Sequence, residues 1–285
     1  MRSLSKSLRH GRQRTLRVRN RVYHALRMSS PAERRTIIIL GCQRSGTTLM
    51  LDLFAEDRRT MIYPEFSALS GGAEDRGLRL RKLPEVRAQI ERVRAPITVL
   101  KPLVESQHAH SLLEGLPDAR VVWMFRGFES VAVSNINYFG TENGARDLRL
   151  LLTNDPPNWR GEFVPDSTRA VLADHYSADM NPYDAAALFW WARNRLFFDL
   201  GLDEHPDVHL CEYEALVAAP RRVMNSIYDF CDVDRPARDT TTRIHSEARD
   251  RGASSAITSE VEAVCEELQA KLVDYSSTPR TAVIE

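Results

Sequence analysis

The chain has 285 residues, of which 43% are hydrophobic and 27% are charged, with 39 basic and 39 acidic side chains. This composition is typical of a globular protein and excludes a disordered or fibrous one. Because no apolar run approaches the roughly 20 residues that cross a bilayer, we expect no transmembrane segment. No apolar stretch follows the basic start either, so we expect no secretory signal.

The basic charge is concentrated at the start of the chain. Residues 1–35 contain eleven Arg or Lys and one acid, which leaves a net charge of −10 on the remaining 250 residues. We predict a basic arm over 1–33, followed by one domain over 34–285. The arm favours peripheral contact with an anionic membrane, while a solvated tail and an organellar transit peptide are the alternatives. No motif for specific nucleic-acid recognition accompanies it.

Four cysteines lie far apart, without the paired spacing of a zinc site or a disulfide framework. Free thiols are typical of a reducing compartment, so we expect a cytoplasmic protein that is peripheral at a membrane if the arm binds one.

From residue 34 onward, short apolar runs alternate with helical patterns. The expected strands are 36–40, 60–63, 97–100, 121–125 and 207–211, and the first helices are 48–55, 84–93, 106–115 and 130–138. This alternation predicts an α/β fold, a P-loop-type central parallel β-sheet flanked by helices.

The second half of the domain departs from this repeat. Residues 140–183 are rich in Asn, Asp and Pro and contain Trp159 and Arg160, which favours a long lid-like insertion. The aromatic segment 185–200 predicts a buried helix, and 259–274 has the apolar spacing of an amphipathic one.

The clearest motif is Gly41-Cys-Gln-Arg-Ser-Gly-Thr-Thr48, which lies between the first expected strand and the first expected helix. Two glycines that bracket four residues allow backbone N–H groups to converge on phosphate oxygens, and the helix N-terminus adds its dipole. A simple turn with a threonine cap is the alternative. The context favours phosphate binding.

The loop lacks the parts of a nucleotide triphosphatase. Thr47 stands where such a loop carries a lysine, and the strand 121–125 ends in Arg126 where a metal-binding Asp is expected. We therefore expect no metal. Arg126 and Ser134, eight residues later, are placed to hold a second anion together.

In these motifs the chain resembles the sulfotransferase family, whose donor is 3′-phosphoadenosine 5′-phosphosulfate (PAPS). GCQRSGTT looks like its 5′-phosphosulfate loop, in the form of the tyrosyl-protein and carbohydrate branches. RVVWMFRGFESVAVS (120–134) looks like its 3′-phosphate motif, and VHLCEYEALVAAP (208–220) is similar to a third stretch. The resemblance implies a set of donor-binding residues, which comprises Arg44, Ser45, Gly46, Thr47, Thr48, Arg126, Ser134 and Tyr213.

The resemblance also implies catalytic roles. Arg44 would stabilise the bridging oxygen of the donor, and Lys101, after the strand 97–100, would lie near the transferred group. Glu65, which follows the strand 60–63, is the favoured general base. His108 is the competing base, although the position that matches the histidine of the cytosolic branch is Leu103.

The resemblance implies that the acceptor is a hydroxyl of a carbohydrate, a lipid or a phenol, and the sequence does not distinguish them. Two other functions stay open on the sequence alone. One is a P-loop kinase or nucleotide hydrolase, and the other is a non-catalytic module that senses adenosine 3′,5′-bisphosphate (PAP), the desulfated donor.

Overall fold

The computed structural model describes most of the chain as two compact units. The described residues are 11, 15, 16, 18–20, 23, 34–71, 77–242, 244 and 256–278. The first unit comprises 1–40, 47–122 and 220–243, and the second comprises 41–46, 123–219 and 244–285. The loop motif is therefore shared: its first six residues belong to the second unit, and Thr47 begins the first unit's next helix.

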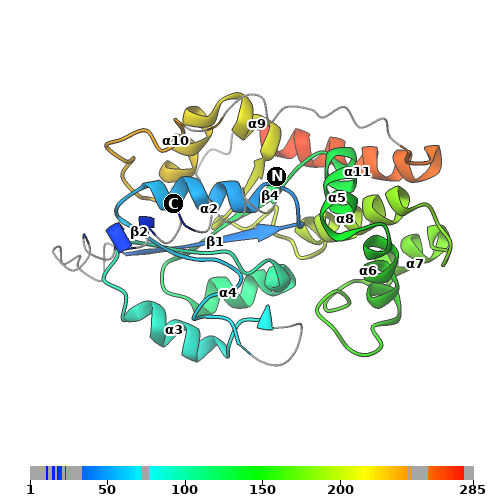
Figure 1. Ribbon diagram of the computed structural model, residues 1–285, viewed down its shortest axis with the longest axis horizontal. Helices are drawn as coiled ribbons and strands as arrows, with labels where there is room; N and C mark the ends of the chain where they lie inside the picture. The colour runs from blue at the N-terminus through cyan, green and yellow to red at the C-terminus, as the bar shows by residue number, and fades with distance from the viewer. Residues whose placement is uncertain are drawn as a thin grey trace. The chain divides into compact units, whose positions relative to one another are not determined.

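A five-stranded sheet of order β2-β3-β1-β4-β5 confirms the predicted α/β class (Figure 1). Its strands are β1 (Arg35–Gly41), β2 (Thr60–Tyr63), β3 (Ile97–Leu100), β4 (Ala119–Phe125) and β5 (Val208–Glu212). β3 pairs in parallel with both β1 and β2. β1, β3 and β4 are almost entirely buried, as the continuous apolar runs of a sheet covered on both faces require.

Helices of the first unit cover both faces of its strands. Figure 1 shows α2 and α10 on one side and α3 and α4 on the other. Their bounds are α2 (Thr47–Glu56), α3 (Leu83–Glu91), α4 (Ala109–Gly115) and α10 (Pro220–Phe230), with a 3₁₀ helix η3 (Leu103–His108) before α4. The helix expected over 106–115 thus begins earlier, as a tighter 3₁₀ turn.

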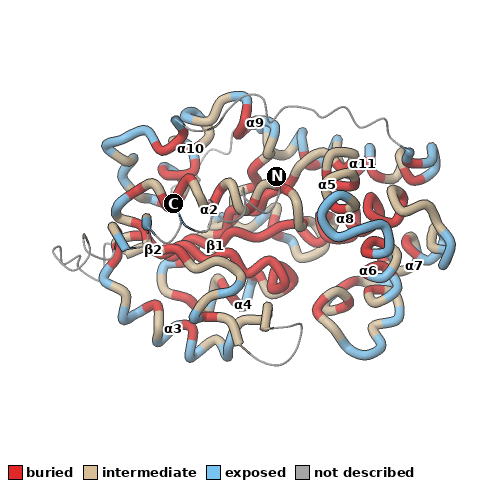
Figure 2. Tube along the Cα trace, in the orientation of Figure 1, coloured by how far each residue is buried: buried red, intermediate tan, exposed pale blue. Residues whose placement is uncertain are grey.

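The second unit is built around one buried helix, α8 (Pro182–Asp199), which confirms the expectation for 185–200 (Figure 2). Its remaining helices are α5 (Phe128–Phe139), α6 (Glu142–Thr153), α7 (Asp166–His175), α9 (Tyr213–Ala218) and α11 (Ser259–Ser277). α5, α6, α7 and α11 all pack on α8.

The segment 140–183 is more regular than its composition indicates. It contains α6 and α7, and both helices pack against α8. Buried Asp147 on α6 accepts a hydrogen bond from Arg160 Nε at 2.9 Å, which fastens the two parts of the segment together. The segment is therefore a packed part of its unit, and a lid function for it stays a prediction.

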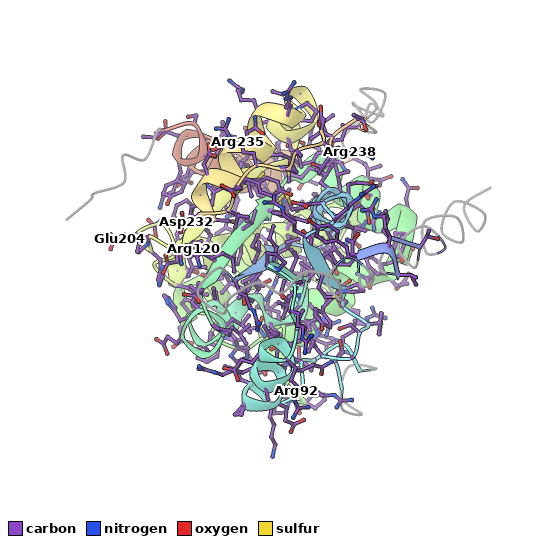
Figure 3. The ribbon with its side chains drawn as sticks, turned by 90° about the vertical axis from the view of Figure 1, so that its left-hand side faces the viewer. Arg92, Arg120, Glu204, Asp232, Arg235 and Arg238 are labelled. Carbon is purple, nitrogen blue, oxygen red and sulfur yellow. The ribbon has the colours of Figure 1, made fainter. Side chains whose placement is uncertain are left out.

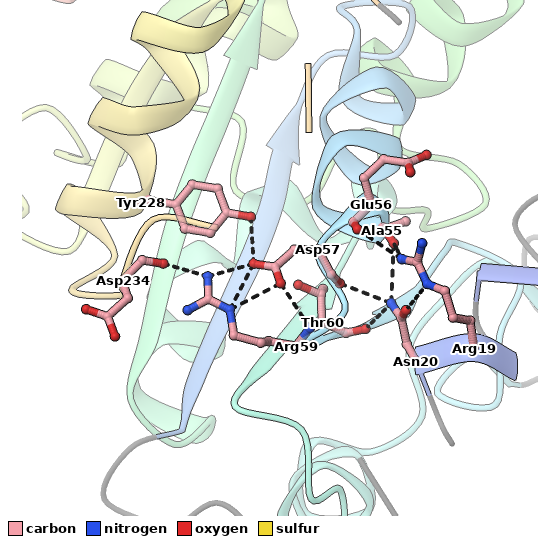
Figure 4. A network of polar contacts seen from close by, with 9 residues as sticks. All are labelled: Arg19, Asn20, Ala55, Glu56, Asp57, Arg59, Thr60, Tyr228 and Asp234. Atoms are coloured by element: carbon pink, nitrogen blue, oxygen red, sulfur yellow. Dashed lines mark hydrogen bonds and ion pairs between the residues drawn. The ribbon is translucent and has the colours of Figure 1, made fainter. Parts of the chain in front are cut away.

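The end of α2 is held by two residues of the basic arm. Asn20 is 2% exposed, and its Nδ2 donates hydrogen bonds to the carbonyls of Ala55, Asp57 and Thr60 (Figure 4). Arg19 donates to the carbonyl of Glu56 at 2.9 Å. The contacts to Ala55 and Glu56 satisfy carbonyls in the last turn of α2, which a helix end leaves without partners. Most of the arm, and with it the membrane-contact prediction, lies outside the described residues.

Asp57 links the turn after α2 to α10. Its carboxylate accepts hydrogen bonds from Arg59 Nη2 at 2.7 Å and from the Tyr228 hydroxyl at 3.1 Å, and Arg59 also donates to the carbonyl of Asp234 (Figure 4). Burial, and then the neighbouring Asp57, raise the pKa of Tyr228. The turn is therefore anchored from both sides.

The outer side of α10 and the turn after it carry exposed ion pairs. Asp232 pairs with Arg35, and Arg235 pairs with Asp229, each at 2.5 Å. Asp232, Asp229 and Arg235, of which Figure 3 labels the first and the last, are more than half exposed, and solvent screening makes such pairs weak. Within the described ranges, no helix combines the length and hydropathy that a membrane crossing needs.

Candidate active site

The two glycines of the loop motif are required by its geometry. Gly41 and Gly46 have φ angles of 120° and 85°, which favour glycine. A Cβ at Gly41 would lie 2.2 Å from the carbonyl oxygen of Met124, and one at Gly46 would lie 2.3 Å from the ring of Tyr213. The loop therefore runs in close contact with the end of β4 and the start of α9.

Arg44 adopts a backbone conformation that is unusual for its type. Its φ is 69°, in the left-handed region, which costs a non-glycine residue about 1–3 kcal/mol and is typical of functional sites. Its Nε donates a hydrogen bond to Ser134 Oγ at 3.0 Å, and its guanidinium lies 4.4 Å from the centre of the Tyr138 ring. The side chain is thus held by α5 on two sides.

Tyr138 is a part of the site that the sequence reasoning missed. It lies four residues after Ser134 on α5, so the two side chains share one face of the helix. That spacing is the signal that identifies it, once Ser134 is taken as a site residue.

Arg126 lies at the end of β4 and stacks on Tyr213. Its guanidinium is 4.5 Å from the ring centre, and its Nε is 3.8 Å from a carboxylate oxygen of Glu214. The Nε atom is buried and makes no hydrogen bond within the described part of the chain. Ser134, which the sequence paired with Arg126, instead accepts from Arg44 here.

Ser45 is fully buried in the loop. Its backbone N–H donates to the carbonyl of Cys42 at 3.3 Å, while its Oγ has no hydrogen-bond partner among the described residues. A buried hydroxyl without a partner is costly, by about 1–3 kcal/mol. Ser45 Oγ and Arg126 Nε are two of several buried polar atoms of the second unit that make no hydrogen bond within the described residues, and an anionic ligand would satisfy both.

In the first unit, strand register brings Lys101 and Glu65 together. Tyr63 of β2 is paired with Leu100 of β3, and the Lys101 N–H donates to the Tyr63 carbonyl at 3.0 Å. Both strands therefore end side by side, and Lys101 Nζ donates to Glu65 Oε2 at 2.9 Å and to Thr48 Oγ1 at 3.2 Å. Three residues named from sequence thus form one connected cluster.

The members of this cluster differ in exposure. The Lys101 side chain is 6% exposed, whereas that of Glu65 is 27% exposed. Within the described ranges, the hydrogen bond to the Glu65 carboxylate is accepted by Oε2, from Lys101. Glu65 and Lys101 both line a small recess at the ends of β2 and β3.

His108, the competing base, belongs to a different cluster. Its Nε2 lies 3.3 Å from Arg79 Nη2 and 3.9 Å from a carboxylate oxygen of Glu105. It does not line the recess that contains Glu65 and Lys101. The geometry therefore places Glu65, and not His108, beside Lys101. Among the described residues, no three His, Cys, Asp or Glu side chains gather as a metal site would require.

Comparison with known proteins finds a family model that matches most of the chain. The family model described as "Sulfotransferase domain" matches residues 34–249. No curated protein matches the chain.

Several solved structures are similar to this chain at low sequence identity. A sulfotransferase domain from the Synechococcus PCC 7002 olefin synthase is 18% identical, with 87% of this chain and 98% of that one covered and a TM-score of 0.48. A sulfotransferase domain from the curacin biosynthetic pathway is 16% identical, with coverage of 83% and 98% and a TM-score of 0.47. Sulfotransferase STF9 from Mycobacterium avium is 14% identical, with coverage of 92% and 82% and a TM-score of 0.47.

Proposed function

Because the chain belongs to the sulfotransferase domain family, we propose that it transfers a sulfuryl group from PAPS to an acceptor hydroxyl. The observation that supports the donor assignment is that the second unit contains buried polar atoms that make no hydrogen bond within the described residues. Within the described residues, Ser45 Oγ and Arg126 Nε make no hydrogen bond; Ser45 lies in the glycine-bracketed loop and Arg126 lies at the end of β4. Buried groups of this kind are stable when a ligand completes their hydrogen bonds.

The chemistry of these residues fits the two anionic ends of PAPS. The loop Gly41–Thr48 would hold the phosphosulfate through backbone N–H groups and the Ser45 hydroxyl. Arg126 and Ser134 would hold the 3′-phosphate, because a guanidinium and a hydroxyl are strong donors to phosphate oxygens. The ring of Tyr213, which contacts Gly46 and Arg126, would then face the adenosine.

Thr47, which stands where the loop of a nucleotide triphosphatase carries a lysine, also favours PAPS as the donor. Thr47 replaces the cation that contacts the terminal phosphates of a triphosphate, and Arg126 replaces a metal-binding carboxylate. Both substitutions suit a nucleotide that carries a phosphosulfate and a 3′-phosphate. They favour PAPS over Mg²⁺–ATP.

In the proposed reaction, the donor supplies an activated sulfuryl group and the chain supplies proton transfer and charge stabilisation. Glu65 Oε1 accepts the proton of the acceptor hydroxyl as a new S–O bond forms and the S–O bond to the phosphate breaks. Lys101 holds Glu65 through its Oε2 and places a positive charge beside the group in transfer. Arg44 stabilises the charge on the departing phosphate oxygen, and each such contact contributes about 2.7–4 kcal/mol.

A ligand screen tests the proposal. At 100 times its Kd, a ligand adds about 2.7 kcal/mol to the free energy of unfolding, so PAP should raise the melting temperature while ATP with Mg²⁺ should not. Stabilisation by ATP–Mg²⁺ alone would favour a kinase. Labelled PAPS then shows whether sulfate reaches an acceptor, and PAP binding without any transfer would favour a sensing module.

A further inference from the structure

Tyr138 is an aromatic side chain in an exposed place. It lies at the end of α5 and is 48% exposed, next to Phe139, whose ring meets it edge-on with 4.6 Å between the ring centres. The guanidinium carbon of Arg44 lies over the Tyr138 ring, 4.4 Å from its centre. All three residues belong to the second unit. Because the face of an aromatic ring attracts a cation, this contact orients Arg44 as well as covering it.

The two contacts that α5 makes with Arg44 constrain different parts of its guanidinium. The bond from Nε to Ser134 Oγ, at 3.0 Å, fixes one edge of the group. That edge carries one of the five N–H donors, and the other four are on the two Nη atoms. The Tyr138 ring lies against the guanidinium and so limits its rotation about the fixed edge. Ser134 and Tyr138 together therefore determine where the four Nη donors point.

The helix that carries this ring is itself fastened by buried polar contacts. Asn135 of α5 is 1% exposed, and its Oδ1 accepts a hydrogen bond from Asn143 Nδ2 at 3.3 Å. Asn143 of α6 is buried as well, and its Nδ2 also donates to Asp147 Oδ2 at 2.9 Å. Buried polar groups that satisfy one another favour one arrangement of the helices that carry them. The Tyr138 ring is thus presented by a helix with a fixed position.

The backbone of Arg44 explains why its side chain needs this support. Its φ of 69° is in the left-handed region, where a residue other than glycine is strained. Such strain persists only when the surrounding structure determines the conformation. The ring of Tyr138 and the hydroxyl of Ser134 are two contacts that offset the strain and keep Arg44 in the observed conformation.

We propose that Tyr138 is a positioning residue, whose ring face holds the guanidinium of Arg44 in the orientation that binds the 5′-phosphate end of the donor. The inference rests on the proposed function, in which Arg44 contacts the departing phosphate oxygen. That oxygen belongs to the 5′-phosphate of PAP, so the orientation of Arg44 can be measured as affinity for PAP, without any acceptor. The ring acts through the electron density of its face, and an aliphatic side chain does not replace it.

Calorimetric titration of the full chain tests this inference with two nucleotides, PAP and adenosine 3′-phosphate, which lacks the 5′-phosphate. Tyr138→Leu should raise the Kd for PAP about 5–30-fold, the loss expected for a partly exposed contact between a cation and a ring. The Kd for adenosine 3′-phosphate should stay within about twofold, and Tyr138→Phe, which keeps the ring, should bind both nucleotides within the same limit. The control is Phe163→Leu, at an exposed aromatic residue of the same unit, and it should leave both Kd values unchanged.

Ring electronics and a double variant distinguish positioning from packing. Phenylalanines with one, two or three ring fluorines at position 138 keep the shape of the ring and withdraw electron density from its face. The Kd for PAP should therefore rise with each added fluorine. If Tyr138 acts through Arg44, the double variant of Arg44→Ala and Tyr138→Leu should bind PAP no more weakly than Arg44→Ala alone.

The outcomes separate the role of Tyr138 from the proposed function. If wild type does not bind PAP, the proposed function fails and the role of Tyr138 fails with it. If wild type binds PAP, only the role of Tyr138 is overturned by equal PAP affinity in wild type and Tyr138→Leu, by equal losses for both nucleotides, by a flat fluorine series or by additive losses in the double variant. Should Tyr138→Leu not melt cooperatively, the fluorinated variants, which preserve the ring, decide the question.

Discussion

The two groups of candidate site residues differ in how their polar atoms are satisfied. In the second unit, Arg44 and Arg126 rest on aromatic rings, and two buried polar atoms, Ser45 Oγ and Arg126 Nε, make no hydrogen bond within the described ranges. In the first unit, Lys101 is bonded to both Glu65 and Thr48. The first group would gain hydrogen bonds from the proposed anionic donor, whereas the second is already connected by strand register.

This difference indicates a division of tasks. Groups whose hydrogen bonds are missing gain most when a ligand arrives, so the second unit is suited to donor binding. Groups that are already paired are oriented before any substrate binds, so the first unit is suited to proton transfer. Variants in the second unit should therefore change donor affinity or charge stabilisation. Variants in the first unit should change turnover with donor affinity intact.

The largest expected effect is that of Glu65→Gln. Loss of a general base should lower kcat by about 10²–10⁴-fold, while the Kd for PAP stays within twofold of wild type, about the precision of the measurement. The measurement is steady-state sulfation with labelled PAPS, together with calorimetric titration of PAP. Glu85→Gln, an exposed carboxylate on α3, is the control. Equal activity of the two variants would remove Glu65 from the reaction and reopen the case for His108.

Arg44→Ala should have the next largest effect on activity. Removal of a group that stabilises developing charge lowers kcat by about 10²–10³-fold, and the loss of its bond to Ser134 weakens PAP binding as well. Rapid-quench measurement of a single turnover separates the two effects. The control is Arg149→Ala, at an exposed arginine of the same unit, and it should leave both kcat and PAP binding unchanged. A normal single-turnover rate in Arg44→Ala would show that the arginine only binds the donor.

Arg126→Ala should act on donor affinity. A hydrogen bond to a charged group is worth about 1.5–3 kcal/mol, so the Kd for PAP should rise by about 10–150-fold. Adenosine 5′-phosphosulfate, which lacks the 3′-phosphate, should bind equally to wild type and variant. A similar loss for both nucleotides would place Arg126 away from the 3′-phosphate.

The smallest effects concern the buried thiols at high pH. Burial raises the pKa of Cys42, Cys211 and Cys231 to about 12. In the unfolded chain each thiol ionises near 9, so the unfolded state loses protons first, and stability falls as pH rises between about 9 and 12. The limit is about 1.4 kcal/mol per thiol per pH unit.

Urea unfolding at pH 8 and pH 10 measures this loss. Cys42→Ala should reduce this pH-dependent loss of unfolding free energy by the contribution of one thiol. PAP should slow the alkylation of Cys42, which lies in the proposed donor loop, more than that of Cys231 in the first unit. Equal protection of both thiols would indicate that donor binding does not distinguish the two units.

The amino-acid sequence determined the class of fold and nearly all of the candidate site residues. The apolar runs located every strand of the sheet to within two residues, and the signal is clearest for β1, β3 and β4, because a strand buried on both faces must be apolar throughout. The glycine spacing located the loop, because only glycine fits beside Met124 and Tyr213 at positive φ. These features are local, and a local pattern is sufficient to reveal them.

Tertiary structure alone decided which of these residues meet. The pairing of Tyr63 with Leu100 brings Glu65 to Lys101, and the register of two strands is set by the packing of the whole sheet. The bond between Arg44 and Ser134 joins positions 90 residues apart. The helices of 140–183 were missed because polar composition conceals helices that are stabilised mainly by packing on α8. Contacts at long range depend on the complete core, and no segment of the chain encodes them by itself.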